Sequence, residues 1–291
     1  MNKSLHQIYV ILFFVVGIGA TLLLAINGYH YYSTPLEERF FQSQDEMLKP
    51  SGILGHGFGI IGSLMMIFGV ALYMIRKRVR RFFGYGYLKH WLEFHIFLCT
   101  VGPIFVLYHT AFKFGGIVAV SFWSMVAVVA SGVAGRFIYV QIPRTIQGKE
   151  LNAKELNELN DDLTHKLKKE YSINGNIISK LDKHSQTDKY RQVGFGTSFV
   201  MMIQDYFGTR SVLHQIKREL NRLSIKGERE KEILRISKSK LVLSRKIGML
   251  RTTQKLFRYW HIVHLPFAIT MFVIMFVHIA VTIIFGYKWI F

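Results

Sequence analysis

Two apolar stretches decide the fold: WLEFHIFLCTVGPIFVLYHTAF at residues 91–112 and IVHLPFAITMFVIMFVHIAVTIIF at residues 262–285. Each stretch carries two histidines that are 14 residues apart, His95 with His109 and His264 with His278. In an α-helix, 14 residues rise about 21 Å and return to within about 40° of the starting direction. Each stretch therefore predicts a helix that presents two imidazoles on one face at two different depths.

The composition divides the chain into an apolar part and a basic part. Of its 291 residues, 51% are hydrophobic, yet 37 Lys and Arg stand against 18 Asp and Glu. A helix needs about 20 apolar residues to cross a bilayer. Five stretches meet this length: residues 8–27, 53–75, 91–112, 117–140 and 262–285. We expect the first to remain as an anchor helix, because no small-residue cleavage site follows it.

These stretches predict an all-α integral membrane protein with a five-helix transmembrane bundle. Residues 1–142 hold the first four spans. Residues 143–259 form a basic helical cytoplasmic module, inserted between the fourth and fifth spans. Residues 260–291 hold the fifth span, which is expected to pack with the other four.

Basic residues set the expected orientation. The connection after the second span is basic, with Arg76, Lys77, Arg78, Arg80, Arg81 and Lys89, whereas the connection after the first span is mostly acidic. Arg136 and Arg144 follow the same rule at the end of the fourth span. By the positive-inside rule, the N-terminus is cytoplasmic and the C-terminus lies outside. The membrane is expected to be the plasma (inner) membrane. His95 and His264 then share the inner leaflet, and His109 and His278 share the outer leaflet.

Four histidines in apolar spans indicate a binding site, because ionisable side chains are costly inside a bilayer. Neutral imidazole is the commonest metal-ligating side chain, and haem iron accepts it as an axial ligand. Two parallel helices with matched histidines predict two stacked haems, one between His95 and His264 and the other between His109 and His278. The single cysteine, Cys99, excludes a CxxCH attachment, so two non-covalent b haems per chain are expected.

Basic side chains near the inner histidines are candidates for contacts with haem propionates. His261 precedes His264 by three residues, and we expect it to reach an inner propionate together with Arg258. An interfacial place for His261 beside Trp260 fits the sequence equally well. Arg136 is either a snorkelling anchor or a counter-charge for the same propionate, and the anchor is favoured.

His56 lies near the outer end of the second span, within Gly55-His56-Gly57-Phe58-Gly59. A histidine at this depth predicts a catalytic role: it can contact a propionate, transfer a proton or bind a quinone headgroup. The surrounding glycines also fit close helix packing without any chemical role for His56.

The four matched histidines resemble the bis-histidine pattern of the ferric reductase and NADPH oxidase transmembrane domain, and more loosely that of other bacterial di-haem cytochromes b. The resemblance covers the spans and lies in the spacing. It implies an oxidoreductase subunit that moves electrons across the membrane, from a cytosolic or quinol donor to an outer acceptor. The sequence departs from the family in having five spans and no flavin and nicotinamide domain after Phe291, so direct use of NADPH is not expected.

The module at residues 143–259 carries two apolar stripes. One comprises Leu213, Ile216, Leu220 and Leu223, and the other comprises Ile233, Leu234, Leu241, Leu243, Ile247 and Leu250. An antiparallel hairpin and a dimeric coiled coil, which would make a homodimer, both fit them. Gly194-Phe195-Gly196 lacks the rest of a nucleotide fingerprint. The basic charge suits a soluble electron-transfer protein, anionic lipid or simply solvent, and nucleic acid is not an expected partner.

A second class of function also fits the sequence. A haem-free membrane protein could use His56, His95, His109 and His278 to move metal ions or protons, with the helical module as a regulator. Transport favours acidic residues in the spans, and only Glu93 lies near one. Electron transfer through two haems is therefore the favoured interpretation.

Overall fold

The computed structural model describes residues 3–143, 150–169, 171, 177–179, 181 and 195–285. These residues form helices and connecting turns, and none of them forms a β-strand. The described part contains five segments that are long and apolar enough to cross a membrane: Ser4–Ser33, Asp45–Arg78, Leu88–His109, Gly116–Gln141 and Leu250–Ile284. The predicted helical class and the five apolar helices are confirmed. Arg144 and Gly194 lie outside the described residues.

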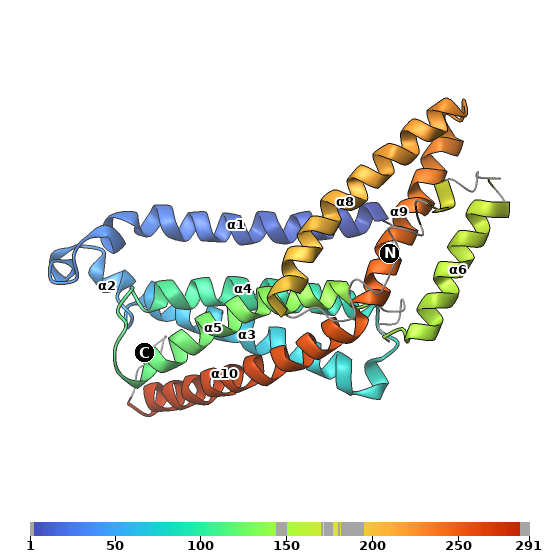
Figure 1. The fold of residues 1–291 in the computed structure, drawn as a ribbon. Coiled ribbons are helices and arrows are strands. Elements are labelled where there is room, and N and C mark those ends of the chain that lie inside the picture. Colours follow the sequence, from blue (N-terminus) through green and yellow to red (C-terminus); the bar gives the residue numbers. More distant parts are fainter. Residues whose placement is uncertain are drawn as a thin grey trace. The chain divides into compact units, whose positions relative to one another are not determined.

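The chain divides into two compact units, Met1–Ala134 with Ile262–Phe291, and Gly135–His261. The helices of the first unit are α1 (Lys3–Ser33), α2 (Asp45–Leu48), α3 (Ile53–Arg78), α4 (Leu88–His109), and parts of α5 (Gly116–Gln141) and α10 (Leu250–Ile284). Two short 3₁₀ turns, η1 (Arg39–Phe41) and η2 (Arg80–Phe82), precede α2 and α4. Within the first unit, α4 and the last part of α10 run in the same direction (Figure 1). Two matched histidine pairs require this direction.

Glycines bring α3 and α4 close together. A Cβ on Gly62 would stand 2.6 Å from the carbonyl oxygen of Gly102, and a Cβ on Gly102 would stand 2.8 Å from that of Gly62. A Cβ on Gly69 would stand 3.0 Å from Sγ of Cys99. Small residues permit such approach between helices, and close approach places backbone oxygens of α3 within reach of side chains on α4.

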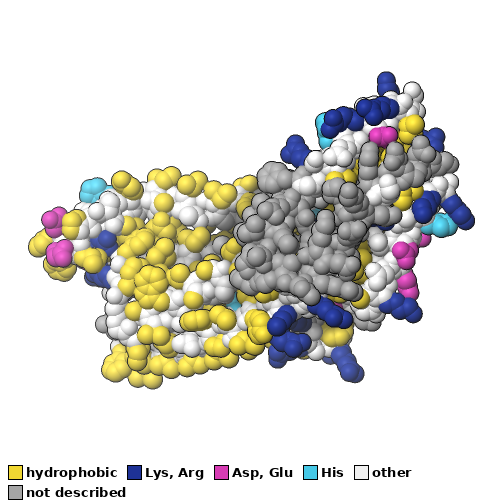
Figure 2. All heavy atoms as spheres, in the orientation of Figure 1, with side chains coloured by type: hydrophobic (Ala, Val, Ile, Leu, Met, Phe, Trp, Pro, Cys, Tyr) yellow, Lys and Arg dark blue, Asp and Glu magenta, His cyan; other side chains and the backbone are white. Residues whose placement is uncertain are grey.

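The first unit buries little of its apolar surface. Its interior holds a cluster from α3, α5 and α10: Met66, Phe122, Met125, Met271 and Met275. On α1, by contrast, Ile8 is 65% exposed and Ile26 is 73% exposed. Hydrophobic side chains cover much of the visible face of this unit (Figure 2). A helix with apolar residues on its outer side suits a lipid environment.

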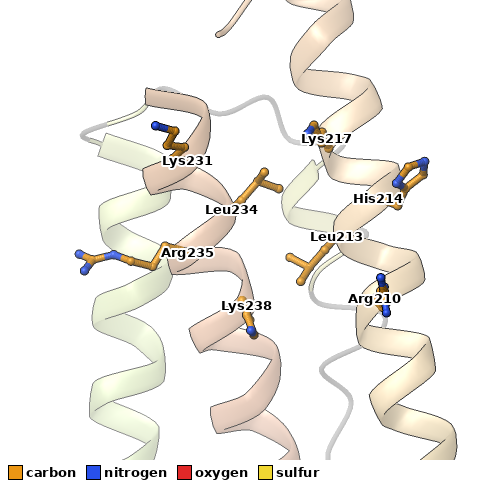
Figure 3. A pocket seen from close by; sticks show the side chains of 8 residues that line it. All are labelled: Arg210, Leu213, His214, Lys217, Lys231, Leu234, Arg235 and Lys238. Carbon is orange, nitrogen blue, oxygen red and sulfur yellow. The ribbon is translucent and has the colours of Figure 1, made fainter. Parts of the chain in front are cut away.

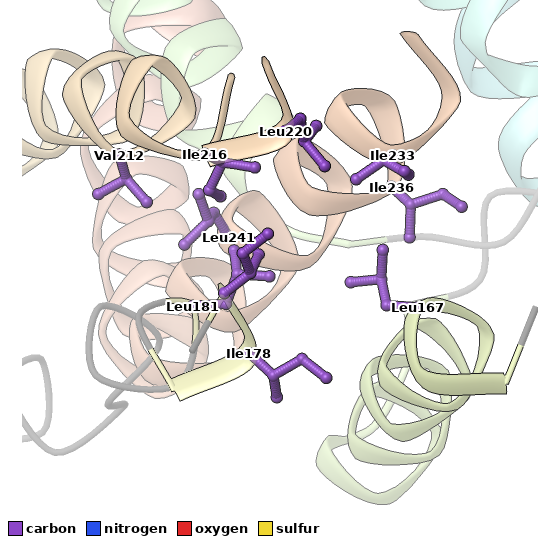
Figure 4. Packing of buried hydrophobic residues seen from close by; sticks show 10 residues of the cluster. Leu167, Ile178, Leu181, Val212, Ile216, Leu220, Ile233, Ile236 and Leu241 are labelled. Carbon is purple, nitrogen blue, oxygen red and sulfur yellow. The ribbon is translucent and has the colours of Figure 1, made fainter. Parts of the chain in front are cut away.

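The second unit is built around an ordinary hydrophobic core. Its helices are α6 (Ala153–Lys169), α8 (Phe195–Arg222) and α9 (Glu228–Gly248), with part of α5 and of α10. Figure 4 shows members of the core cluster, which comprises Leu167, Ile177, Ile178, Leu181, Val212, Ile216, Leu220, Ile233, Ile236 and Leu241. Gly227, with φ of 76°, lies in the turn between α8 and α9. The two predicted stripes thus pack together in part within one chain, through Ile216, Leu220, Ile233 and Leu241 with Leu213 and Leu234 against them. Leu223 remains 45% exposed, and Leu243, Ile247 and Leu250 lie outside this cluster.

Polar contacts also join the helices of this second unit. Lys240 of α9 is only 2% exposed, and its Nζ donates to Oγ1 of Thr164 on α6 at 2.6 Å. The start of α6 has a reciprocal capping box, in which Asn152 and Glu155 each accept from the other's backbone N–H at 2.8 Å. Burial lowers the pKa of Lys246 on α9, and the positive charge of the neighbouring Arg245 lowers it further.

Candidate functional site

Histidines from three helices meet at one end of the first unit. His56 lies near the start of α3, His109 ends α4, and His278 lies near the end of α10. The His109 ring centroid is 6.3 Å from that of His56 and 6.4 Å from that of His278, with ring planes inclined at 67° and 56°. All three residues are partly buried. The structure therefore brings one predicted ligand pair together with the predicted catalytic histidine.

The backbone of α3 orients the ring of His109. Nδ1 of His109 donates to the carbonyl oxygen of Gly55 at 2.8 Å. A carbonyl oxygen can only accept, so Nδ1 carries the hydrogen and the lone pair of the neutral ring lies on Nε2. Gly59 provides the space for this ring, because a Cβ at that position would stand 2.8 Å from Nδ1 of His109.

His95 has the same kind of partner farther back along α4. Its Nδ1 donates to the carbonyl oxygen of Gly69 on α3 at 3.1 Å. Sγ of Cys99 lies 3.6 Å from the same nitrogen, and the ring of Tyr73 has its centroid 5.3 Å away. The lone pair of this neutral ring is therefore also on Nε2.

His264 is oriented by a hydroxyl group on α5. Its Nδ1 lies 2.7 Å from Oγ of Ser131, and that hydroxyl donates to the carbonyl oxygen of Val128 at 2.9 Å. A hydroxyl can donate to Nδ1 of His264 or accept from it, so this contact orients the ring without fixing its tautomer. Three of the four predicted ligands thus have Nδ1 within hydrogen-bond distance of an oxygen on a neighbouring helix, and for His95 and His109 that oxygen is a carbonyl, which sets the tautomer. Metal-ligating histidines usually have such a partner for their second nitrogen.

The spacing of the His109–His278 pair fits two imidazoles on opposite sides of one metal. Metal–imidazole bonds are about 2.0–2.1 Å long, which puts the centroids of two such rings about 6 Å apart. The observed distance is 6.4 Å. Ordinary ring contacts span roughly 4.5–7 Å, so the hydrogen bond from Nδ1 of His109 to Gly55 supports ligation more strongly than this distance does.

The residues predicted to contact propionates all belong to the second unit. The Arg136 guanidinium lies over the ring of Tyr139, 5.7 Å from its centroid. His261 is exposed, and its Nδ1 donates to the carbonyl oxygen of Phe257 at 2.9 Å. Arg258 is also exposed. Their contact with a haem stays a prediction.

Two arginines count in the sequence only as positive charges in loops. In the structure both are buried, and each binds several backbone carbonyl oxygens. Arg39 is 5% exposed and donates to the carbonyl oxygens of Thr34, Tyr32 and Ala111. Arg76 is 8% exposed and donates to those of Tyr85, Phe83 and Gly86. A count of positive charges cannot reveal this role, because it depends on where the loop carbonyls point.

A basic groove of about 430 Å³ lies between α8 and α9 in the second unit. Arg210, His214 and Lys217 line it from α8, and Lys231, Arg235 and Lys238 line it from α9 (Figure 3). Acidic neighbours pair with part of this charge, as in Lys231 with Glu228 at 2.7 Å and Arg235 with Glu232 at 2.6 Å. The remaining excess of cations suits an anionic partner.

A further polar cluster, which the sequence does not reveal, is formed by His6 of α1 with His90 and Glu93 of α4. His6 is distant from the other two in the chain, so no local spacing could reveal it.

No family model, curated protein or solved structure matches this chain.

Proposed function

We propose that the chain is an integral membrane cytochrome b that transfers electrons through two b haems. His109 and His278 would hold one haem, and His95 and His264 the other. The observation that carries this proposal is that Nδ1 of His95, His109 and His264 each lies within hydrogen-bond distance of an oxygen of another helix. For His95 and His109 that oxygen is a carbonyl, so the lone pair of the neutral ring is on Nε2, where it can ligate a metal.

The membrane location rests on the five apolar helices and on the exposed apolar side chains of α1. We assign the N-terminus and the second unit to the cytoplasm and the C-terminus to the outside, because the connection after α3 is rich in Arg and Lys. In this orientation, His56, His109 and His278 lie toward the outer surface.

Some residues of the chain would hold the haems, and another would transfer protons. When bound, haem supplies a one-electron carrier whose potential depends on its axial ligands and their hydrogen bonds. The carbonyl oxygens of Gly55 and Gly69 fix the ring orientations of His109 and His95. His56, next to His109, is positioned to hold or move a proton when an outer substrate such as a quinone is oxidised or reduced.

The basic groove of the second unit supports an acidic soluble electron-transfer protein as the cytoplasmic donor. Complementary charge increases the rate of encounter between such partners. Flavin and NADPH binding are not part of the proposal. Purified protein should therefore show no flavin absorbance, and NADPH alone should not reduce its haems.

The three-histidine cluster also supports the second candidate, a haem-free protein that moves metal ions or protons. His56, His109 and His278 bring three imidazoles from three helices to one place. Three neutral imidazoles are also a common set of zinc ligands. The absorption spectrum separates the two functions, because only a haem protein has intense visible bands.

Pyridine haemochrome analysis of protein purified from cells supplied with haem precursor tests the proposal. We expect two b haems per chain, with spectra of low-spin, six-coordinate iron. One haem per chain would remove one of the two pairs from the proposal. A chain without haem that binds divalent metal through His109 and His278 would replace it with the second candidate.

A further inference from the structure

A cluster of metal-binding side chains lies apart from the four predicted haem ligands. It comprises His6 near the start of α1, and His90 and Glu93 in the first turns of α4. One ligand atom from each residue lies within 4.8 Å of the other two. We call this set the His6–His90–Glu93 cluster.

The spacings within the cluster fit one tetrahedral metal ion. Two ligand atoms on a tetrahedral metal with bonds of about 2.0–2.1 Å lie about 3.4 Å apart. Nε2 of His6 is 3.6 Å from one carboxylate oxygen of Glu93, and Nδ1 of His90 is 3.1 Å from the other. Small rotations of the side chains would bring all three donors onto one ion.

The side chains of the cluster are largely buried, and the ammonium group of Lys89 lies next to them. The side chains of His6 and His90 are 23% exposed and that of Glu93 is 13% exposed. Nζ of Lys89 lies 3.1 Å from Nε2 of His6 and 3.7 Å from Glu93. Lys89 itself is 53% exposed, so its ammonium group can leave for solvent when another cation binds.

We propose that the His6–His90–Glu93 cluster binds a divalent transition metal of the zinc type. Two imidazoles and one carboxylate are a donor set that Zn²⁺ accepts, whereas Mg²⁺ and Ca²⁺ prefer oxygen ligands alone. The ion takes the place of the Lys89 ammonium, and water fills the fourth position. No redox step is involved.

The metal would fasten the first end of α1 to α4. Along its length, α1 meets α4 through aromatic side chains, including Phe13, whose ring stacks on that of Phe97 at 4.4 Å, and Tyr32, whose ring centroid is 5.1 Å from that of Tyr108. Its far end is tied separately, where the hydroxyl of Tyr31 donates to Asp45 at 2.8 Å. A metal ion bound by both His6 and Glu93 would likewise fix the start of α1 to α4.

Zinc binding to the purified full chain in nanodiscs tests this site. Zn²⁺ is added, the excess is removed with a weak chelator, and bound zinc is measured by mass spectrometry. Absorption bands of tetrahedral Co²⁺ give a second readout. We expect one ion per chain, and His6→Ala or Glu93→Gln should weaken binding by about 10- to 100-fold or more. His30→Ala, an exposed histidine at the other end of α1, should leave binding unchanged.

Lys89→Met distinguishes a metal site from a simple hydrogen-bonded cluster. It removes the competing ammonium group and keeps all three ligands, so the zinc affinity should rise. Unchanged zinc binding in both Glu93→Gln and His6→Ala would overturn the proposal. So would zinc binding by Lys89→Met alone, because the native chain would then hold no metal. The haem content is measured in the same samples, so failure of this site and failure of the proposed function are seen separately.

Discussion

The His95–His264 and His109–His278 pairs have the same spacing along the same two helices, but their surroundings differ. At one end, the ring centroids of His109 and His278 are 6.4 Å apart, and His56 lies beside His109. At the other end, His95 is tied to α3 through Gly69, and His264 is tied to α5 through Ser131. Equal spacing gives equal depth, whereas the neighbouring helices decide how each ring is oriented.

The comparison suggests different tasks for the two ends. His56 gives the His109–His278 end a third imidazole at ring-contact distance, which suits proton-coupled exchange with a substrate. The His95–His264 end has Cys99 and Tyr73 beside His95. Unperturbed phenol and thiol groups titrate well above neutral pH, whereas imidazole titrates close to it, so this end is less suited to acid–base chemistry than the end with His56.

Removal of a ligand should give the largest effect. His109→Ala and His278→Ala should each remove the same single haem, and His95→Ala and His264→Ala should each remove the other, because one axial imidazole is lost from its pair. Haemochrome stoichiometry and the low-spin electron paramagnetic resonance signals measure this, with His214→Ala in the second unit as the control. If His264→Ala keeps both haems and His261→Ala does not, the register assigned to α10 is wrong.

Replacement of the third histidine should separate chemistry from haem binding. His56→Ala should keep both haems but slow electron exchange with the outer substrate by about 10²- to 10⁴-fold, the usual range of general acid–base assistance. Stopped-flow absorbance with quinol, ferric chelate and oxygen measures the rate. An unchanged rate with every substrate would mean that His56 serves helix packing and takes no part in proton transfer.

Loss of the hydroxyl that orients His264 should weaken one haem only. Ser131→Ala removes the hydroxyl partner of Nδ1 of His264, and loss of such a partner typically lowers metal affinity by about 10- to 100-fold. Ser121→Ala is a matched control, because this hydroxyl on the same helix donates to the carbonyl oxygen of Met271 instead of a histidine. Haem titration of the apoprotein measures both variants. Equal losses would show that α5–α10 packing, and not the hydrogen bond to Ser131, holds the ring.

A glycine next to His109 allows the same test at the other end. Gly59→Ala places a Cβ against the His109 ring, so it should lower the affinity for that haem by about tenfold. Gly19→Ala on α1 has no atom within 4 Å of its new Cβ and serves as the control. Unequal loss of the two haem signals is expected, and equal loss would contradict the assignment of His109.

The smallest effect is expected in the second unit. Asn152→Ala removes one half of the capping box of α6, which should destabilise this helix end by about 1 kcal/mol. Hydrogen exchange in the first turn of α6 should become faster, while both haem spectra remain unchanged. Altered haem spectra would mean that the two units are coupled more strongly than proposed.

The five apolar helices could be predicted because hydropathy and length depend on composition alone. Their bounds could not. The first was predicted at residues 8–27 and the helix extends over Lys3–Ser33, while the last was predicted from residue 262 and α10 begins at Leu250. Polar residues continue a helix well, but they fall below any apolar threshold.

The candidate site was predictable in part for a similar reason. The 14-residue spacing of His95 and His109 is local, and helix geometry converts it directly into a shared face. Arg39 and His6 are different, since Arg39 donates to the carbonyl oxygen of Ala111 and His6 meets His90 and Glu93, all in distant segments of the chain. The partners of Arg76 are backbone carbonyls of the loop that follows it, which any residue type possesses. Nothing in the local sequence marks those partners.

The sequence by itself determined that this chain is helical, that five of its helices are apolar, and that two of them carry matched histidines. Only the tertiary structure decided which oxygen lies beside Nδ1 of His95, of His109 and of His264. The partners of His95, His109 and His264 are 26, 54 and 133 residues away along the chain, and two of them are backbone oxygens that any residue type possesses. Helix periodicity acts within one segment, whereas hydrogen bonds between helices exist only after those segments have packed.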